Sequence, residues 1–234
     1  ADFVICSHPT TGKECTMLAA ATNAVMAGCL PSYFPVLVAG LTAVAAPDYN
    51  FHAASASTGG SAPLLIVSGP VVNEIGMNAG AGVFAPGTRA NATIGRAVRL
   101  ILMNVFQMIP GLSDQSTQGN PGKYSFCIAE REDVNPWALL HKELGFGELS
   151  SVTAFAGSSF NNVENHGGNT PESILDSIAD SMGNLGNITI GESVIVLSPE
   201  HAAIVASMIH TGEFTIAQIK EELIRDGLPI RRKW

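Results

Sequence analysis

Short runs of apolar, β-branched residues alternate along the chain with segments of helical periodicity. Such runs lie at residues 3–6, 64–67, 151–155 and 194–197, and a small polar loop and a helical pattern follow each one. Uninterrupted Val, Ile and Leu residues are typical of strands that are buried on both faces of a sheet. The pattern predicts an α/β fold with repeated β-loop-α units, a mostly parallel sheet and helices on both faces.

The helical segments carry their own signals. Residues 94–105 place apolar side chains at i, i+3, i+4 and i+7, which predicts a helix with one apolar face. Thr170 and Pro171 are typical of a helix start, and residues 170–185 and 215–226 are predicted as helices. Residues 124–129 alternate in polarity and predict a further strand.

The first helix is predicted at about residues 16–29, with an inward stripe formed by Leu18, Val25, Met26 and Cys29. No segment of the chain reads as a linker between domains. We therefore expect a single α/β domain over residues 1–234, with two possible half-units at about 1–115 and 116–234.

The composition limits the kinds of partner that the protein is expected to bind. Charged residues make up 14% of the chain and apolar residues 46%, so much of the surface is expected to be hidden in a wide sheet or against other subunits. This favours a homo-oligomer. The net charge of −8 argues against nucleic-acid binding, which needs clustered Lys and Arg. No run approaches the roughly 18 apolar residues that a membrane span needs, so no membrane partner is expected.

The four cysteines, Cys6, Cys15, Cys29 and Cys127, have no CxxC pair and no zinc-like spacing. We expect reduced thiols in a cytoplasmic protein and no metal site. The first residue is Ala rather than Met, as expected of a processed or trimmed chain.

A block of Gly, Ala and Asn residues at 76–96 follows the second predicted strand. Small residues let backbone N–H groups approach a ligand closely, and ligands gather beyond the carboxyl ends of strands in open α/β sheets. Arg89 and Arg96 would supply positive charge for an anion, Asn78 and Asn91 would orient it, and Thr93 would lie near the helix start. The alternative is a tight turn that packs helix against strand. The spacing matches no nucleotide-binding motif and names no cofactor.

Two further loops resemble this block. Residues 116–124 contain Lys123, which could hold a carboxylate or phosphate or could lie in a solvated turn. Residues 161–169 contain His166, which could transfer protons or could be an ordinary surface histidine. We expect the three loops to meet at one rim of the sheet.

Two cysteines are candidate nucleophiles. Cys29 lies on the predicted inward stripe, which favours an inert thiol, yet it is the first candidate if the chemistry uses a thiol. Cys15 lies just before or within the first turn of the same helix, where the helix N-terminus would lower its pKa, although the neighbouring Glu14 opposes this.

Four runs together carry a family resemblance: residues 23–31, 89–96, 119–127 and 198–202. The chain resembles the bacterial UGSC-type selenocysteine/cysteine proteins over most of residues 15–225. The resemblance implies an α/β domain and thiol chemistry. The naming motif, a selenocysteine or cysteine followed by Gly-Ser-Cys, is absent, so the thiol role would pass to Cys29, to another segment or to another chain.

These observations leave three hypotheses open. The first is an enzyme that acts on a small carboxylated or phosphorylated molecule, by a thiol or through His166. The second is a non-catalytic ligand-binding or assembly subunit of a homo-oligomer. The third, ranked last, is a metal enzyme that uses histidines without ligand spacing on one element, namely His8, His52, His166, His201 or His210.

Overall fold

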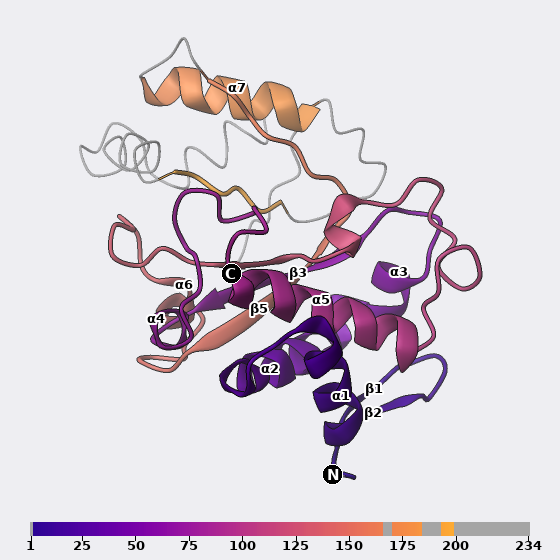
Figure 1. The fold of residues 1–234 in the computed structure, drawn as a ribbon. Coiled ribbons are helices and arrows are strands. Elements are labelled where there is room, and N and C mark those ends of the chain that lie inside the picture. Colours follow the sequence, from indigo (N-terminus) through magenta and orange to yellow (C-terminus); the bar gives the residue numbers. More distant parts are fainter. Residues whose placement is uncertain (1, 166–169, 184–192, 199–234) are drawn as a thin grey trace. The chain divides into compact units, whose positions relative to one another are not determined.

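The computed structural model describes residues 2–165, 170–183 and 193–198 (Figure 1). The chain divides into two compact units. The first contains Ala1–Glu132 and Ala138–Phe160, and the second contains Asp133–Trp137 and Asn161–Trp234. The half-unit boundary expected near residue 115 falls inside the first unit.

A three-stranded sheet forms the centre of the first unit, in the order β4-β3-β5. Strand β3 (Ala62–Ser68) lies between β4 (Cys127–Ala129), which runs parallel to it, and β5 (Ser151–Gly157), which runs antiparallel. The prediction of an α/β protein is confirmed at this level. The described sheet is nevertheless mixed rather than mostly parallel.

The antiparallel pairing follows from the connection between β4 and β5. Strand β4 ends beside Val67, near the carboxyl end of β3, and only the four-residue helix α6 (Leu140–Glu143) intervenes before Ser151 pairs with Ser68. A parallel pairing needs a crossover that carries the chain back to the opposite end of the sheet. This segment makes no such crossover, so β5 enters the sheet in the reverse direction.

The predicted strand at residues 3–6 is present as β1 (Val4–Ser7), but it belongs to a separate two-stranded sheet. It pairs antiparallel with β2 (Glu14–Thr16). The turn between them closes with a hydrogen bond of 2.8 Å from the N–H of His8 to the carbonyl oxygen of Lys13. A short turn of this kind returns the chain onto β1 itself and produces a hairpin.

Three longer helices and several short ones complete the first unit. The longer ones are α1 (Met17–Ala27), α2 (Phe34–Val44) and α5 (Arg89–Asn104). The short ones are α3 (Phe51–Ser55), α4 (Val71–Glu74) and the 3₁₀ turns Pro31–Tyr33, Pro47–Tyr49 and Pro121–Lys123. Thr16 caps α1 by accepting a hydrogen bond from the N–H of Ala19. Helix α5 starts five residues before the predicted residue 94.

The main core lies between the helices and one face of the sheet. Helix α2 packs against β5, α5 packs against β4, and α1 packs on α5 (Figure 1). Leu65 and Val67 of β3 join Leu37 of α2 and Ile94 and Ile101 of α5 in this core. Alternate residues of β3 therefore meet the two helices, as a strand's period of two requires.

Helix α1 buries a different face from the one predicted. Ala20, Asn23 and Ala24 are buried, and Asn23 accepts a hydrogen bond of 2.7 Å from Asn104 of α5. Leu18, Val25 and Met26 of the predicted inward stripe are 59%, 76% and 63% exposed, respectively. The prediction of that stripe is wrong because α1 meets α5 through its small residues.

In the second unit, helix α7 (Pro171–Gly183) confirms the helix predicted at 170–185. Ile174 and Ile178 are buried, and Met182 and Leu197 pack against them. Residues 193–198 form no strand, so the strand predicted at 194–197 is not present. The helices predicted after Ser198 and at 215–226 lie outside the described residues. No helix in the described part of the chain has the length and apolar character to cross a membrane.

Candidate functional site

The first turn of α5 meets the end of α1, and three of the predicted site residues gather there. Arg89, the first residue of α5, donates a hydrogen bond of 2.9 Å from Nε to the carbonyl oxygen of Gly28. Gly28 ends α1 with φ of +92°, and a Cβ atom placed on it would lie 3.5 Å from Cγ2 of Thr93. Cys29 follows directly, so Cys29, Arg89 and Thr93 form one cluster, which we call the Cys29 cluster.

The electrostatics of Cys29 reflect these neighbours. Burial raises the pKa of the Cys29 thiol above its ordinary value, and a hydrogen bond with Thr93 and the positive charge of Arg89 offset only part of that rise. The Thr93 hydroxyl also donates a hydrogen bond of 2.8 Å to the carbonyl oxygen of Arg89. A hydroxyl has one hydrogen to donate, so Thr93 must rotate to donate it to a Cys29 thiolate.

A second thiol lies beside this cluster. Cys127, at the start of β4, is buried, and burial together with the nearby Cys29 thiol raises its pKa to about 12. A thiol with so high a pKa stays protonated at neutral pH and is a poor nucleophile. Of these two neighbouring thiols, only Cys29 has groups beside it that favour the thiolate.

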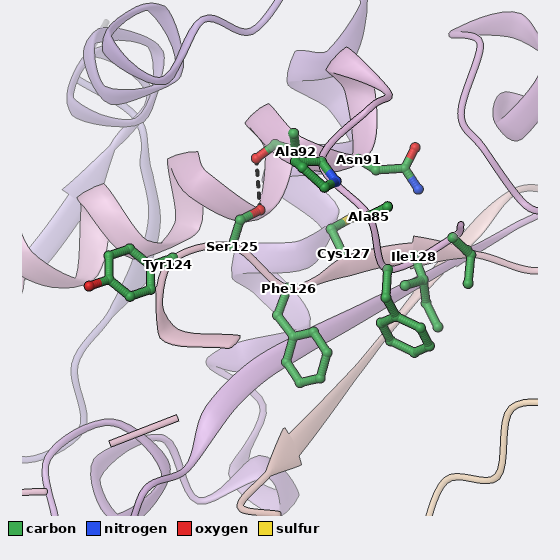
Figure 2. Close-up of a pocket in the computed structure, with 11 residues that line it drawn as sticks. Ala85, Asn91, Ala92, Tyr124, Ser125, Phe126, Cys127 and Ile128 are labelled. Carbon is green, nitrogen blue, oxygen red and sulfur yellow. Dashed lines mark hydrogen bonds between the residues drawn. The ribbon is translucent and has the colours of Figure 1, made fainter. Parts of the chain in front are cut away.

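Cys127 also lines a cavity of about 200 Å³ in the first unit (Figure 2). Figure 2 shows Asn91 and Ala92 of α5 across from the segment 124–128, and Ser125 Oγ donates a hydrogen bond of 2.7 Å to the carbonyl oxygen of Ala92. Residues 83–86 complete the lining. The cavity lies where the chain enters β4, on the amino side of that strand, rather than beyond the carboxyl ends as predicted.

An aromatic cluster joins parts of the chain near two of the predicted loops. Phe84 of the glycine-rich block lies 6.0 Å from Phe126 and 5.2 Å from Phe160, ring centre to ring centre. Phe126 lies 6.1 Å from Phe160, which follows β5. The block at 76–96 and the end of the loop before β4 therefore come together in the first unit. Residues 161–169 belong to the second unit, and His166 lies outside the described residues.

The two predicted ligand-orienting asparagines bind each other. Asn78 donates its backbone N–H to Asn91 Oδ1, and Asn91 Nδ2 donates to the carbonyl oxygen of Asn78, both at 2.9 Å. The Asn78 side chain also bonds to Gly80 and Ala81. These bonds hold the glycine-rich block against α5 and use much of the two amides' bonding capacity. A role in binding a ligand stays a prediction.

The predicted anchor Lys123 is engaged inside the protein. Its ammonium group donates hydrogen bonds of 2.8 and 2.6 Å to the two carboxylate oxygens of Asp114. Asp114 is 3% exposed and also accepts a hydrogen bond of 3.3 Å from Arg99. Burial raises the pKa of Asp114, but the hydrogen bonds from Lys123 and Ser116 and the Lys123 charge outweigh it and hold that pKa below its ordinary value.

The remaining predicted residues take different places. Cys15 lies in β2 and is fully buried, and burial raises its pKa to about 11, which corrects the lowering expected from a helix N-terminus. Thr93 lies in the second turn of α5 rather than at its start. Arg96 is half-buried in the same helix, and no described carboxylate pairs with it.

A polar group at the carboxyl end of β3 has no counterpart in the predictions. Glu132 accepts a hydrogen bond from the N–H of Gly69, and its Oε1 lies 3.6 Å from Nε2 of the buried His141. The hydroxyl groups of Ser68 and Ser151, opposite each other in the sheet, are buried and have no hydrogen-bond partner among the described residues. No spacing in the sequence links these five residues, because they come from separate segments of the chain.

The described residues contain no group of three or more His, Cys, Asp or Glu side chains that could hold a metal ion.

Comparison with known proteins adds a partial likeness. No protein-family model and no solved structure matches the chain.

The chain is similar over part of its length to proteins named imidazole glycerol phosphate synthase subunit HisF. For Deinococcus radiodurans, 28% of 102 residues are identical, covering 44% of this chain and 39% of that protein. For a strain of Prochlorococcus marinus, 31% of 102 residues are identical, covering 42% and 39%. For Lactococcus lactis, 29% of 99 residues are identical, covering 42% and 38%. The matched segment thus spans about two-fifths of the length of these relatives.

Proposed function

We propose that the protein is an enzyme that acts on a small anionic molecule, carboxylated or phosphorylated, by thiol-based chemistry at Cys29. The observation that carries this proposal is the position of Cys29 beside Arg89 and Thr93, which lie in the first two turns of α5. The partial likeness to subunits of imidazole glycerol phosphate synthase favours a phosphorylated molecule, since that enzyme's name includes one.

Arg89 is the group that we assign to the anion. It is exposed, and its hydrogen bond to Gly28 uses only Nε, while no described carboxylate pairs with it. A guanidinium group offers further N–H donors that suit carboxylate and phosphate oxygens. The first-turn N–H groups of α5 add partial positive charge, because Thr88 makes no side-chain cap to them. Arg96, on the same helix, would contribute charge without direct contact.

Cys29 would act as the nucleophile. Loss of its proton gives a thiolate, which the Arg89 charge favours and to which the Thr93 hydroxyl can donate a hydrogen bond after rotation. An anion held by Arg89 would bring its reactive carbon or phosphorus atom near this sulfur. The neighbouring cavity, with Asn91 in its lining, would receive the apolar part of the molecule.

Other residues have smaller parts in this proposal. The resemblance to UGSC-type proteins supports thiol chemistry, and the absence of their naming motif leaves Cys29 as the first candidate. His166 remains a candidate proton donor, and a reducing compartment such as the cytoplasm would keep the thiol active. Lys123 and Cys15 are unsuited to contact a ligand, because Asp114 holds Lys123 and the core encloses Cys15.

Alkylation mapping tests the proposal. We expect iodoacetamide to modify Cys29 of the folded protein faster than the other three cysteines, and inorganic phosphate to slow that reaction. Cys127→Ala is the matched control, since it removes the neighbouring thiol and should leave Cys29 labelling in place. Equal labelling of Cys29 with and without phosphate, or no labelling of it in the folded chain, would contradict the proposal.

A second candidate function is that of a non-catalytic assembly subunit of a homo-oligomer. The exposed Leu18, Val25 and Met26 of α1 favour it, and residues 16–47 contain no charged side chain. A neutral apolar surface of this kind suits contact with a second copy of the chain. Light scattering after size exclusion would show a dimer or larger species that Val25→Glu dissociates. Thr22→Glu is the control: it adds the same charge on the same exposed side without removing an apolar side chain, and it should dissociate the species less. A monomeric wild-type chain would contradict this candidate.

A further inference from the structure

Cys6 of β1 and Cys15 of β2 lie opposite each other in the N-terminal hairpin, directly after a register shift between Val4 and Cys6. Opposite residues in antiparallel strands have Cα atoms about 4.5–5.5 Å apart. Their side chains point to the same face of the sheet. A disulfide needs Cα atoms roughly 4.4–6.8 Å apart, so the register alone places these two cysteines within bonding range.

The two thiols also share one environment. Cys15 is fully buried in the main core of the first unit, and the half-buried Cys6 packs against the same core. Burial raises the pKa of Cys6 to about 12 and that of Cys15 to about 11, and the Cys15 thiol adds to the shift at Cys6. Both cysteines are free thiols in the structure. Thiols with such pKa values are mostly protonated at neutral pH and exchange slowly.

We propose that Cys6 and Cys15 form a dithiol site that small-molecule disulfides oxidise to an intramolecular cross-strand disulfide. The Cys6 thiolate, the more accessible of the two, attacks one sulfur of the external disulfide, which forms a mixed disulfide and releases one thiolate. The Cys15 thiolate then attacks Cys6 Sγ, which forms the Cys6–Cys15 bond and releases the second thiolate. The two protons lost by the cysteines go to the two released thiolates, so one external disulfide is reduced for each bond formed.

The bond would have a defined mechanical effect. The hairpin leads directly into α1, because Thr16 ends β2 and caps the helix. Cross-linking residues 6 and 15 restricts the unfolded chain over this short loop and holds β1 against β2 in the folded state. Oxidation therefore fixes the strand pair from which α1 starts, and slow exchange keeps the oxidised and reduced forms distinct.

The test uses the full chain with Cys29→Ser and Cys127→Ser substitutions, so that only Cys6 and Cys15 can pair. Reduced protein is equilibrated with oxidised and reduced glutathione at several ratios, quenched by alkylation and cut with trypsin after Lys13. We expect the piece that contains Cys6 to stay joined to the piece that contains Cys15, with the mass loss of two hydrogens. The native chain should reach half-oxidation at an oxidised-to-reduced ratio at least about tenfold lower than the urea-unfolded chain.

A second measurement keeps Cys29 and Cys127 in place and compares the wild-type chain with a single variant. The unfolding temperature of the wild-type chain should rise by several degrees on oxidation, and Cys6→Ser should abolish the rise while keeping the fold. The proposal is overturned if both thiols remain alkylatable at every glutathione ratio. It is also overturned if the linked peptides come from two chains, or if native and unfolded chains oxidise at the same ratio.

Discussion

Arg89 donates its Nε hydrogen to the carbonyl oxygen of Gly28, and this bond of 2.9 Å joins the start of α5 to the residue before Cys29. The bond fixes a guanidinium group near a thiol that lies between two helices. Local chain geometry sets each partner: Gly28 ends α1 in a left-handed conformation, and Arg89 opens α5. The electrostatics of Cys29 therefore depend on a contact between segments some sixty positions apart.

Arg89→Ala should make Cys29 less reactive. The positive charge of Arg89 lowers the pKa of the thiol, so its removal raises that pKa and reduces the thiolate fraction at a given pH. We expect iodoacetamide to label Cys29 about three- to tenfold more slowly near neutral pH, on the basis that one pKa unit corresponds to a tenfold change. Arg96→Ala, on the same helix, is the control and should change the rate much less. A rate that is unchanged in Arg89→Ala would show that the charge does not act on Cys29.

Asp114→Asn should remove a pH-dependent part of the stability. The folded-state pKa of Asp114 is below its ordinary value of 3.8, so its ionised form stabilises the fold above that value. This contribution is lost as pH falls through the lower folded-state pKa. At neutral pH the free energy of unfolding of the variant should be about 3–5 kcal/mol lower than that of the wild type, because Arg99 and Lys123 lose a buried partner.

Urea unfolding from neutral pH to about pH 2 measures this effect. The difference between wild type and Asp114→Asn should begin to shrink below the ordinary carboxyl pKa and be lost below the lower folded-state pKa, where both side chains are uncharged. A difference that stays constant over the whole range would mean that the ionisation of Asp114 is not its source.

Gly95→Ala should destabilise the contact between α5 and the segment that leads into β4. A Cβ atom at this position would lie 2.5 Å from Ser125 Oγ and 2.6 Å from the backbone nitrogen of Phe126. Alanine favours a helix by about 1 kcal/mol over glycine, but the backbone contact forces a shift that typically costs about 1–3 kcal/mol. Thermal unfolding measures the balance, and we expect a net loss. Gly87→Ala, which meets no atom within 4 Å, is the control and should leave stability nearly unchanged.

Asn91→Ala should loosen the glycine-rich block without unfolding the sheet. The change removes both reciprocal hydrogen bonds to Asn78 and leaves a donor and an acceptor unsatisfied. The free energy of unfolding is expected to fall by about 1–3 kcal/mol for each buried group that loses its partner. Amide hydrogen exchange of Asn78 should become faster, whereas the exposed Asn73→Ala is expected to have no such effect. Unchanged protection at Asn78 would mean that other contacts hold the block.

The sequence predicts individual elements better than their arrangement. The period of Ile94, Val98 and Ile101 identifies α5, but its first turn is hidden because residues 89–93 carry only polar side chains and alanines. The prediction that Leu18, Val25 and Met26 face inward is wrong because it assumes that the face of α1 with the largest side chains is the buried one. Helix α1 instead packs through Ala20 and Ala24, whose small side chains allow a close approach that a hydrophobicity pattern does not register.

The candidate site shows a similar limit. Cys29, Arg89 and Thr93 could each be selected from the sequence by chemical type, but their grouping depends on how α1 meets α5. The engagement of Lys123 with Asp114 could not be predicted, because a salt bridge nine residues apart within a loop follows from the loop's path. The direction of β5 depended likewise on the connection through α6.

The pairing of β3 with β5 has a consequence for folding during synthesis, when the chain leaves the ribosome N-terminus first. Seven residue pairs join Ala62–Ser68 to Ser151–Gly157, whereas β4 supplies only three. Until the ribosome has released β5, one edge of β3 carries apolar side chains and backbone groups without their permanent partners, which is the condition under which strands mispair. A nascent chain or a truncated product that stops before Ser151 should therefore be the species that most needs a chaperone.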